Sequence, residues 1–383
     1  MSQAYCDKNL IQFINPINGD VLNEFDGQIK GKSLEIKVKL LAGNQSRVIV
    51  NGVPATIVNS LASKSDCCCS FSKGEGTLYE AAINLDGYRN TVVAVDENSG
   101  CKNEMVVYWL KNATGKYRIS MDDNIWFLKD IAKNSDKYKS IFENPYLKLY
   151  KDVHDMYGTK VHINLFYQTE GFNLSQMPDK YKSEWKDNAH WIKLTFHSLQ
   201  EFPDRPYANA TYDEIKKDYE LITNEIIRFA GEELLSPVTT VHWGATSLEA
   251  ARALRTMGMK GLVGYFKFAE DGAPLVSYYH DNERIKHINK RDYWKDDKED
   301  IMFVKHDIVL DGTNLKDICP FLDNLKKDPH QSGLIEMLIH EQYFYPHYKA
   351  YQPEYREKVM TAARWATENG YKPAFWSDVV FEK

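Results

Sequence analysis

Histidines and aspartates stand at the ends of strand-like segments in the second two thirds of the sequence. They are Asp122-Asp123, His197, His242, His306-Asp307 and His340-Glu341. The C-terminal ends of parallel strands meet at one rim of a barrel, so we expect these side chains to converge. Histidine together with carboxylate is a ligand set that suits zinc and other transition metals. The pattern therefore favours a metal-dependent reaction.

The segments that must position these residues alternate between strand and helix after Gly115. The expected strands are residues 117–121, 160–167, 191–197, 239–242, 261–266, 302–306 and 334–340. The expected helices are residues 125–134, 141–157, 211–232, 247–257, 314–327 and 353–369. Alternation of this kind is typical of βα units around a parallel sheet or barrel, and predicts an irregular (β/α) barrel over residues 115–383. We expect the polar stretch 278–300 to be a long loop.

Residues 1–114 have a different pattern, with short strand-like runs separated by turn residues. Segment 33–41 alternates apolar and polar residues, which is the period of a half-buried strand. Asn51-Gly52 follows an apolar run and predicts a hairpin. Further strands are expected at 78–85, 90–96 and 104–110. The spacing predicts an immunoglobulin-like β-sandwich as an N-terminal domain.

Four short motifs after residue 116 resemble those of the polysaccharide deacetylases, carbohydrate esterase family four. Arg118-Ile-Ser-Met-Asp122-Asp123-Asn124 resembles the family's Thr-Phe-Asp-Asp-Gly motif, and Phe196-His197-Ser198 resembles the start of its His-Ser-x-x-His motif. Glu336-Met-Leu-Ile-His340 resembles the late strand that ends in a catalytic histidine. Val241-His242-Trp243-Gly244 occupies the place of the Arg-x-Pro motif. The resemblance covers about residues 117–376 and implies a distorted (β/α)7 barrel that hydrolyses an amide or ester on a carbohydrate or related small molecule.

The resemblance also implies roles for single residues. Asp122 corresponds to the general base, Asp123 and His197 to ligands of one divalent metal, and His340 to the general acid. Zinc is the expected metal, with cobalt, manganese or nickel as alternatives. Such a metal polarises the scissile carbonyl and activates water, while a carboxylate takes the water's proton and an imidazolium protonates the leaving group.

The sequence departs from the family pattern at two places. The second histidine of His-Ser-x-x-His is replaced by Glu201, so either Glu201 or Asp204 is expected to complete the metal site. The family's arginine is replaced by His242-Trp243, and His242 would pair with Asp122, ligate the metal or bind substrate. We expect Trp243, Tyr343 and Arg205 to contact substrate, with a packed loop as the alternative for Tyr343 and loop bracing for Arg205.

Two other function classes compete with a metal-dependent hydrolase. The first is a carbohydrate-binding protein whose catalytic site has decayed, which the two departures favour. The second is a metal-free glycoside hydrolase that uses rim carboxylates such as Asp122, Asp123, Glu201 or Glu341. Such enzymes need two carboxyl groups about 5–9.5 Å apart, and adjacent residues on a regular strand point to opposite faces, so Asp122 and Asp123 alone fit poorly.

Composition limits the partners and the location. The chain has 383 residues with 48 Lys and Arg against 54 Asp and Glu, a mild negative balance that argues against a nucleic-acid partner. No window approaches the ~18–20 consecutive apolar residues of a membrane span. The start has no apolar signal sequence, and the six cysteines include three in a row, which is neither a disulfide framework nor a zinc spacing. We expect reduced thiols, a cytoplasmic protein, and any oligomer to form through the N-terminal domain.

Overall fold

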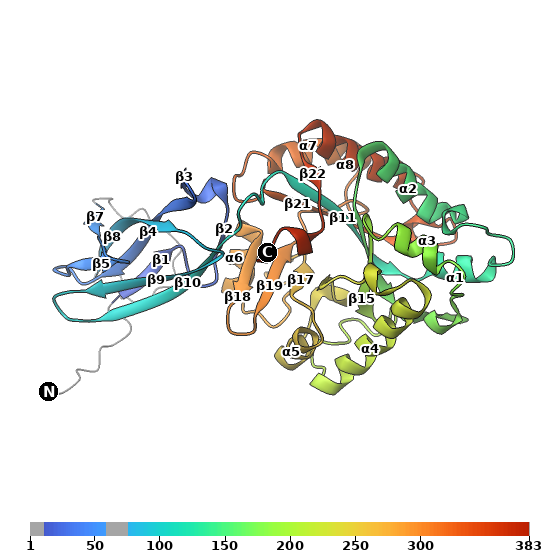
Figure 1. Cartoon of the computed structure of the whole chain (residues 1–383), viewed down its shortest axis with the longest axis horizontal. Helices are drawn as coiled ribbons and strands as arrows, with labels where there is room; N and C mark the ends of the chain where they lie inside the picture. The colour runs from blue at the N-terminus through green and yellow to red at the C-terminus, as the bar shows by residue number, and fades with distance from the viewer. Residues whose placement is uncertain (1–10, 59–75, 383) are drawn as a thin grey trace. The chain divides into compact units, whose positions relative to one another are not determined.

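The computed structural model describes residues 11–58 and 76–382. The chain divides into two compact units, one ending at Asn112 and the other running from Ala113 to Phe381. Figure 1 shows the strands of the first unit in blue and cyan, and the mixed strands and helices of the second in the remaining colours. Cys6 and Cys67-Cys68-Cys69 lie outside the described residues. Cys101 is disulfide-bonded, so the expectation of reduced thiols is wrong for this residue.

Two sheets make up the described part of the N-terminal unit. One has the order β1-β4-β8-β7 with β3 also paired to β4, and the other has the order β2-β10-β9-β5-β6. The first contains β1 (Ile11–Asn15), β3 (Gln28–Lys30), β4 (Ser33–Ala42), β7 (Thr56–Ile57) and β8 (Thr77–Leu85). The second contains β2 (Val21–Leu22), β5 (Val48–Val50), β6 (Val53–Pro54), β9 (Arg89–Asp96) and β10 (Lys102–Trp109). β2 and β10 pair in parallel, and the other pairs are antiparallel.

The two sheets share one hydrophobic core. Every second residue of β4 from Leu34 to Ala42 is buried, as the alternating sequence predicts. These side chains pack in one cluster with residues of β9 and β10. The predicted hairpin is present, with Asn51 and Gly52 both at positive φ (46° and 82°) between β5 and β6. An immunoglobulin-like topology stays a prediction.

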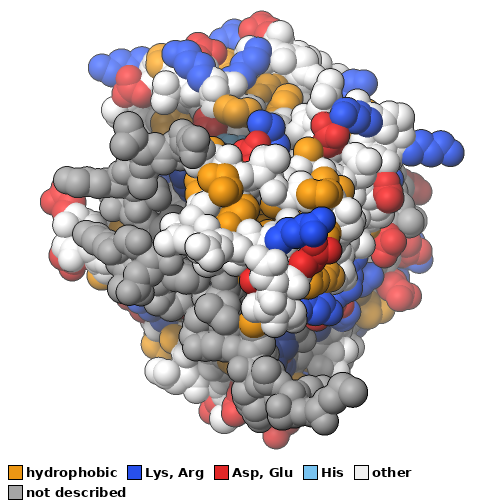
Figure 2. All heavy atoms as spheres, turned by 90° about the vertical axis from the view of Figure 1, so that its left-hand side faces the viewer, with side chains coloured by type: hydrophobic (Ala, Val, Ile, Leu, Met, Phe, Trp, Pro, Cys, Tyr) orange, Lys and Arg blue, Asp and Glu red, His pale blue; other side chains and the backbone are white. Residues whose placement is uncertain are grey.

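The surface of this unit mixes charges of both signs. Its ion pairs include Lys30–Glu35, Lys37–Glu80 and Arg47–Glu97. Figure 2 shows, on one face of the whole molecule, Lys and Arg side chains among Asp and Glu side chains, with hydrophobic groups between them. Among the described residues of this unit, the exposed large hydrophobic side chains are Phe25, Ile29, Val53 and Ile57. Positive and negative side chains therefore do not form separate patches on the face shown in Figure 2.

The strands of the second unit form two sheets. The larger has the order β15-β12-β11-β21-β20 with β22 paired to β11, and the smaller has the order β16-β17-β19-β18. The larger contains β11 (Lys116–Asn124), β12 (Val161–Phe166), β15 (Ile192–Ser198), β20 (Ile308–Val309), β21 (Leu334–His340) and β22 (Lys372–Pro373). The smaller contains β16 (Val238–Thr239), β17 (Gly261–Gly264), β18 (Tyr293–Asp296) and β19 (Ile301–Lys305). The hairpin β13 (Gln168–Thr169) and β14 (Phe172–Asn173) stands apart.

Helices lie on the outside of these strands (Figure 1). They are α1 (Trp126–Lys133), α2 (Pro145–Tyr157), α3 (Lys182–Asp187), α4 (Tyr212–Phe229), α5 (Leu248–Thr256), α6 (Asn282–Arg291), α7 (Leu315–Leu325) and α8 (Tyr355–Glu368). The capping box predicted at Thr211 and Glu214 opens α4. All six residues of β12 are buried, because the strand is covered on both faces. This part of the chain is therefore an α/β unit.

The expected loop at residues 278–300 is wrong. This segment holds α6, capped by Asp281, and the strand β18, which pairs antiparallel with β19. Ile285, Ile288 and Tyr293 are buried there, so a few apolar residues at helical and strand spacing outweigh the many charges around them. Within residues 11–58 and 76–382, no helix has both the length and the apolar character needed to cross a membrane.

Candidate metal centre

Three side-chain atoms converge at the C-terminal ends of the parallel strands. Oδ1 of Asp123 lies 3.0 Å from Nε2 of His197 and 3.1 Å from Nδ1 of His242, and the two histidine nitrogens lie 3.1 Å apart. Asp123 comes from β11, His197 from β15, and His242 from the turn that follows β16. In the described part of the chain, this is the group of histidines and carboxylates compact enough to hold a metal ion.

A backbone irregularity brings both aspartates to the same cavity. The pairing of β11 with β12 shifts between Met121 and Asn124, and Asp123 adopts a left-handed φ of 62°. A regular strand would send Asp122 and Asp123 to opposite faces. Here both line one cavity. A non-glycine residue in this conformation costs ~1–3 kcal/mol and persists only where its surroundings fix it.

In each histidine, the ring nitrogen that points away from Asp123 has a backbone carbonyl as its partner, and this partner determines which nitrogen carries the proton. Nδ1 of His197 faces the carbonyl oxygen of Thr240, and Nε2 of His242 lies 2.9 Å from the carbonyl oxygen of Glu201. A carbonyl only accepts hydrogen bonds, so these two nitrogens donate. When both rings are neutral, they therefore turn unprotonated nitrogens toward each other and toward Asp123.

This arrangement fits a divalent metal. Three acceptor atoms about 3 Å apart, with no hydrogen between them, repel one another unless a cation lies among them. Zinc–nitrogen bonds of about 2.0–2.1 Å in a tetrahedral site separate neighbouring donors by about 3.3 Å, close to the spacing observed. The backbone carbonyls that orient both imidazoles are the usual partners of metal-binding histidines. The residues present therefore match a zinc-type site.

The electrostatics of the cluster favour positive charge. Burial alone would raise the pKa of Asp123, but His197 and His242, which donate hydrogen bonds to its carboxylate when their rings are protonated, outweigh burial and hold that pKa well below its usual value. Burial alone would lower the pKa of His197, but the charges of Asp122 and Asp123 raise it overall. The cluster thus keeps an ionised carboxylate in a buried position and attracts a cation, either a proton on an imidazole or a metal ion.

Asp122 and His340 stand next to this cluster on neighbouring strands. They are directly paired in the parallel register of β11 and β21, and both line the cavity. Oδ1 of Asp122 accepts a hydrogen bond of 2.6 Å from Nδ2 of Asn164. Oδ1 of Asp311 accepts from the backbone nitrogen and from Nδ1 of His340, at 2.9 and 3.0 Å. Burial would lower the pKa of His340, but the carboxylate of Asp311, with smaller effects from Asp123 and Asp122, raises it to about 10.

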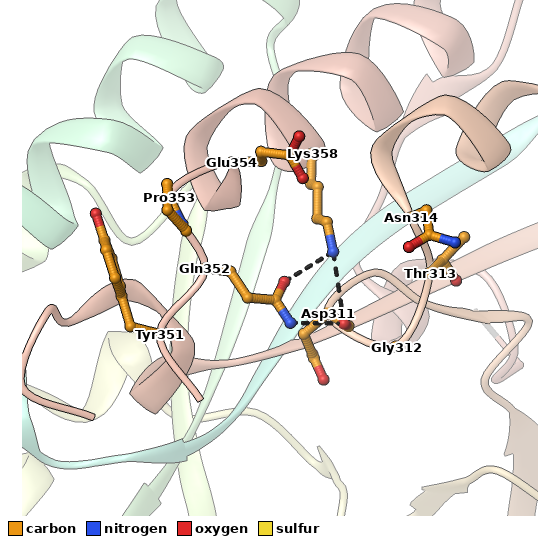
Figure 3. Close-up of a pocket in the computed structure, with 9 residues that line it drawn as sticks. All are labelled: Asp311, Gly312, Thr313, Asn314, Tyr351, Gln352, Pro353, Glu354 and Lys358. Carbon is orange, nitrogen blue, oxygen red and sulfur yellow. Dashed lines mark hydrogen bonds between the residues drawn. The ribbon is translucent and has the colours of Figure 1, made fainter. Parts of the chain in front are cut away.

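Two polar side chains donate hydrogen bonds to the backbone carbonyl of Asp311. Figure 3 shows Gln352 and Lys358 pointing at its backbone carbonyl, with Lys358 coming from α8. Nε2 of Gln352 donates to that oxygen at 2.8 Å, and Nζ of Lys358 donates to Oε1 of Gln352 at 2.7 Å. Lys358 is buried. These contacts fix the segment that carries the partner of His340.

Two hollows open on the cluster. A cavity of about 310 Å³ contains the three clustered residues together with Asp122 and His340. A wider groove of about 790 Å³ shares Asp123 and Glu201 with that cavity. Its other lining residues are mostly aromatic or amide-bearing, and include Trp126, Phe166, Gln168, Gln200, Phe202, Gln342 and Tyr348. A substrate spanning both hollows would place its reacting bond beside Asp123.

The third member of the cluster is a residue for which metal ligation was one of three roles left open by the sequence. It is His242, whereas the carboxylate of Glu201 accepts a hydrogen bond from Nε2 of Gln342 at 2.9 Å and lies outside the cluster. Burial, with a further effect of Asp123, raises the pKa of Glu201. Asp204 has an exposed side chain and lines neither hollow. His242, in the turn after β16, therefore occupies the position in the cluster that the motif spacing predicts for Glu201.

Of the three residues expected to contact substrate, two line the cavity and one does not. Trp243 and Arg205 line the cavity, with the Arg205 guanidinium 6.0 Å from the centre of the Trp243 ring. Tyr343 packs on His340, with ring centres 6.2 Å apart, and is not among the residues that line the cavity or the groove. A contact between Tyr343 and substrate stays a prediction.

Sequence reasoning missed the roles of Glu341 and Asp311. The Glu341 carboxylate accepts hydrogen bonds from the backbone nitrogens of Ile125, Trp126 and Phe127 and so caps α1, which follows directly after the aspartates. It is fully buried and is not among the residues that line the cavity or the groove. Asp311 follows the short strand β20, and an acidic residue after a strand is the signal that would have identified it.

Comparisons with known proteins give distant structural matches. No protein-family model matches the chain, and no curated protein matches it. A 4-α-glucanotransferase from Thermococcus litoralis matches with a TM-score of 0.43 and 11% identity over 69% of this chain, which spans 39% of the length of that enzyme. A CE4 family pseudoenzyme from Bacillus anthracis matches with a TM-score of 0.32 and 9% identity, over 76% of this chain and 84% of that one.

The Bc1960 peptidoglycan N-acetylglucosamine deacetylase matches with a TM-score of 0.32 and 11% identity, over 68% of this chain and 86% of that one. All three TM-scores lie below 0.5. Similarity at this level does not define an activity, so the function has to be inferred from the geometry of the cluster.

Proposed function

We propose that this protein is a metal-dependent hydrolase that cleaves an amide or ester bond on a carbohydrate or related small molecule. One observation carries the proposal: two imidazoles, each oriented by a backbone carbonyl on one ring nitrogen, turn their other nitrogens toward the carboxylate of Asp123 at 3.0–3.1 Å. Asp123, His197 and His242 would hold the metal ion. When bound, it would act as a Lewis acid that polarises the scissile carbonyl and makes water a better nucleophile.

The residues around the cluster can supply both proton transfers. Asp122 takes a proton from the attacking water as its oxygen bonds to the carbonyl carbon, and Asn164 holds the carboxylate in position. His340 is protonated at neutral pH, because Asp311 raises its pKa to about 10. As the bond between carbon and the leaving nitrogen or oxygen breaks, His340 gives its proton to that leaving atom. The products are a carboxylic acid and an amine or alcohol.

The groove supports a carbohydrate as the leaving part. Trp126 makes edge-on contacts with Tyr345 and Tyr348, at ring-centre distances of 5.4 and 5.9 Å, so its ring is held at the groove. Aromatic faces suit the apolar faces of sugar rings, and amide side chains suit their hydroxyl groups. Gln168, Gln200 and Gln342 supply such amides.

The proposal is tested by measuring bound metal and hydrolysis together. Protein purified without chelator is compared with His197→Ala by elemental analysis and by assay on N-acetylated and O-acetylated sugars. We expect about one equivalent of transition metal in the wild type, with metal and turnover both lost in the variant. Absence of metal after supplementation with zinc, cobalt, manganese and nickel would contradict the proposal and favour a carbohydrate-binding protein.

A further inference from the structure

We propose that the cavity beside the cluster binds an aliphatic acyl chain longer than acetyl, so that the substrate is an acyl sugar with a chain of about four to eight carbons. This inference rests on the proposed function and specifies its substrate. The cavity combines the catalytic groups with a wall of apolar side chains. The wall consists of Tyr265, Leu275, Val276, Val309 and Leu338.

One residue of the wall, Val276, packs closely against two glycines. A Cβ atom added to Gly244 would lie 2.3 Å from Cγ1 of Val276, and one added to Gly264 would lie 2.8 Å from the same atom. Both distances are shorter than carbon atoms allow. Val276 is therefore seated directly against two glycines, and the glycines leave the space that Val276 and the cavity occupy. The cavity is a built feature of the segments after β16 and β17.

Two large apolar side chains of the cavity are left uncovered. Trp243 is 46% exposed and Leu275 is 39% exposed. Trp243 also has a φ of 62°, a conformation that a tryptophan adopts only where its surroundings enforce it. Arg205 joins the two, since its guanidinium lies over the Trp243 ring and donates to the carbonyl oxygen of Leu275 at 3.3 Å. Exposed apolar surface of this kind at a cavity marks a binding site.

The volume and the chemistry of the wall select the ligand. A cavity of about 310 Å³ exceeds the ~150 Å³ that accommodates benzene, so it is larger than an acetyl group requires. Leu275, Val276, Val309 and Leu338 have no side-chain polar atoms that could pair with hydroxyl groups. A sugar placed against them would lose its hydrogen bonds to water without replacement, whereas an alkyl chain loses none.

The groove that meets the cavity at Asp123 completes the assignment. It is lined by aromatic and amide side chains, and it shares Asp123 and Glu201 with the apolar cavity. A substrate with a polar part in the groove and an alkyl part in the cavity places the bond between them at the cluster. That bond is the one joining an acyl group to the nitrogen or oxygen of a sugar.

Binding of straight-chain carboxylates tests the inference without turnover, because these are acid products that cannot be hydrolysed. Calorimetric titration of the wild-type protein with acetate, butanoate, hexanoate and octanoate should give a Kd that falls about fourfold per added methylene, up to the length that fills the cavity. In Val276→Phe the added ring occupies the cavity, so the gain with chain length should disappear while acetate binds as before. Equal affinity across the series, or the same gain in Val276→Phe, would overturn the inference.

Two further variants keep the result interpretable. Leu275→Ser replaces a partly exposed side chain, so the fold tolerates it, and we expect it to weaken octanoate binding about threefold to tenfold while leaving acetate unchanged. Val53→Phe makes the same substitution as Val276→Phe at an exposed site of the N-terminal unit and should change nothing. An octanoate affinity unchanged in Leu275→Ser would contradict the inference.

The proposed function can fail separately. If wild-type protein hydrolyses neither N-acetylglucosamine nor N-hexanoylglucosamine but still binds longer carboxylates more tightly, the hydrolase proposal fails and the alkyl site stands. If it hydrolyses N-acetylglucosamine and shows no gain with chain length, the hydrolase proposal stands and the alkyl site fails.

Discussion

Asp122 and His340 occupy paired positions on the neighbouring parallel strands β11 and β21. One is a carboxylate steadied by Asn164, and the other is an imidazole held protonated by Asp311. A proton acceptor and a proton donor therefore flank one cavity beside the cluster of Asp123, His197 and His242. Groups of opposite function in one cavity are what an acid–base reaction requires.

Replacement of the base should separate chemistry from metal binding. Asp122→Asn keeps the size of the side chain and its contact to Asn164 but cannot take a proton. We expect kcat to fall about 10²–10⁴-fold, with metal content as in the wild type because Asp122 lies outside the cluster. Rate assays and elemental analysis on one preparation check this. Loss of metal in this variant would instead make Asp122 a ligand.

The third metal ligand can be identified by a pair of variants. His242→Ala removes an atom that lies 3.1 Å from both Asp123 and His197, so bound zinc should be largely lost. Glu201→Gln keeps the backbone carbonyl that orients His242, so about one equivalent should remain. Zinc titration of both variants measures the difference. Retention in the first and loss in the second would assign the position to Glu201.

The pH dependence of turnover should depend on Asp311. A pKa of about 10 keeps His340 protonated through neutral pH, so wild-type kcat should decline only as the pH rises toward 10. In Asp311→Asn the negative charge is gone and the pKa of His340 falls, which moves the alkaline limb of the profile to lower pH. A pH–rate profile of both proteins checks this. An unmoved alkaline limb would show that His340 is not the acid.

The same pair also contributes to stability with a defined sign. The pKa of His340 is higher in the folded protein than its unperturbed value of about 6.5. Its stabilising contribution is therefore complete below pH about 6.5 and is lost as the pH rises through about 10. Wild type and His340→Gln should thus differ most in free energy of unfolding at neutral to acidic pH and converge at alkaline pH, as urea titrations at several pH values would measure.

Loss of the Glu341 cap should destabilise the site. Glu341→Ala leaves the backbone nitrogens of Ile125, Trp126 and Phe127 buried or nearly so without their acceptor. Unsatisfied buried donors cost ~1–3 kcal/mol each, and water entering the space offsets part of this, so we expect a loss of about 2–4 kcal/mol. Urea denaturation measures it, with Glu354→Ala at the exposed start of α8 as the control.

The order of amino acids was sufficient to predict most of the secondary structure of the second unit and two members of the cluster. The strands that carry Asp123 and His197 were predictable, because burial imposes its period on residues close together in the chain. The position of polar residues after those strands follows from the strands themselves. The hairpin at Asn51-Gly52 was predictable for the same local reason, since that pair suits positive φ.

Contacts between distant segments decided the rest. The presence of His242 in the cluster in place of Glu201 depends on contacts of His242 with His197 and with the backbone carbonyl of Glu201, more than 40 residues away, and no local pattern encodes them. The irregularity at Asp123 turns two adjacent side chains to one cavity, which the period of a regular strand forbids. Segment 278–300 forms a helix and a strand because the side chains of Ile285, Ile288 and Tyr293 are buried in the interior of the folded unit. Each outcome rests on contacts between segments far apart in the sequence, whose free energies appear only once the chain has folded.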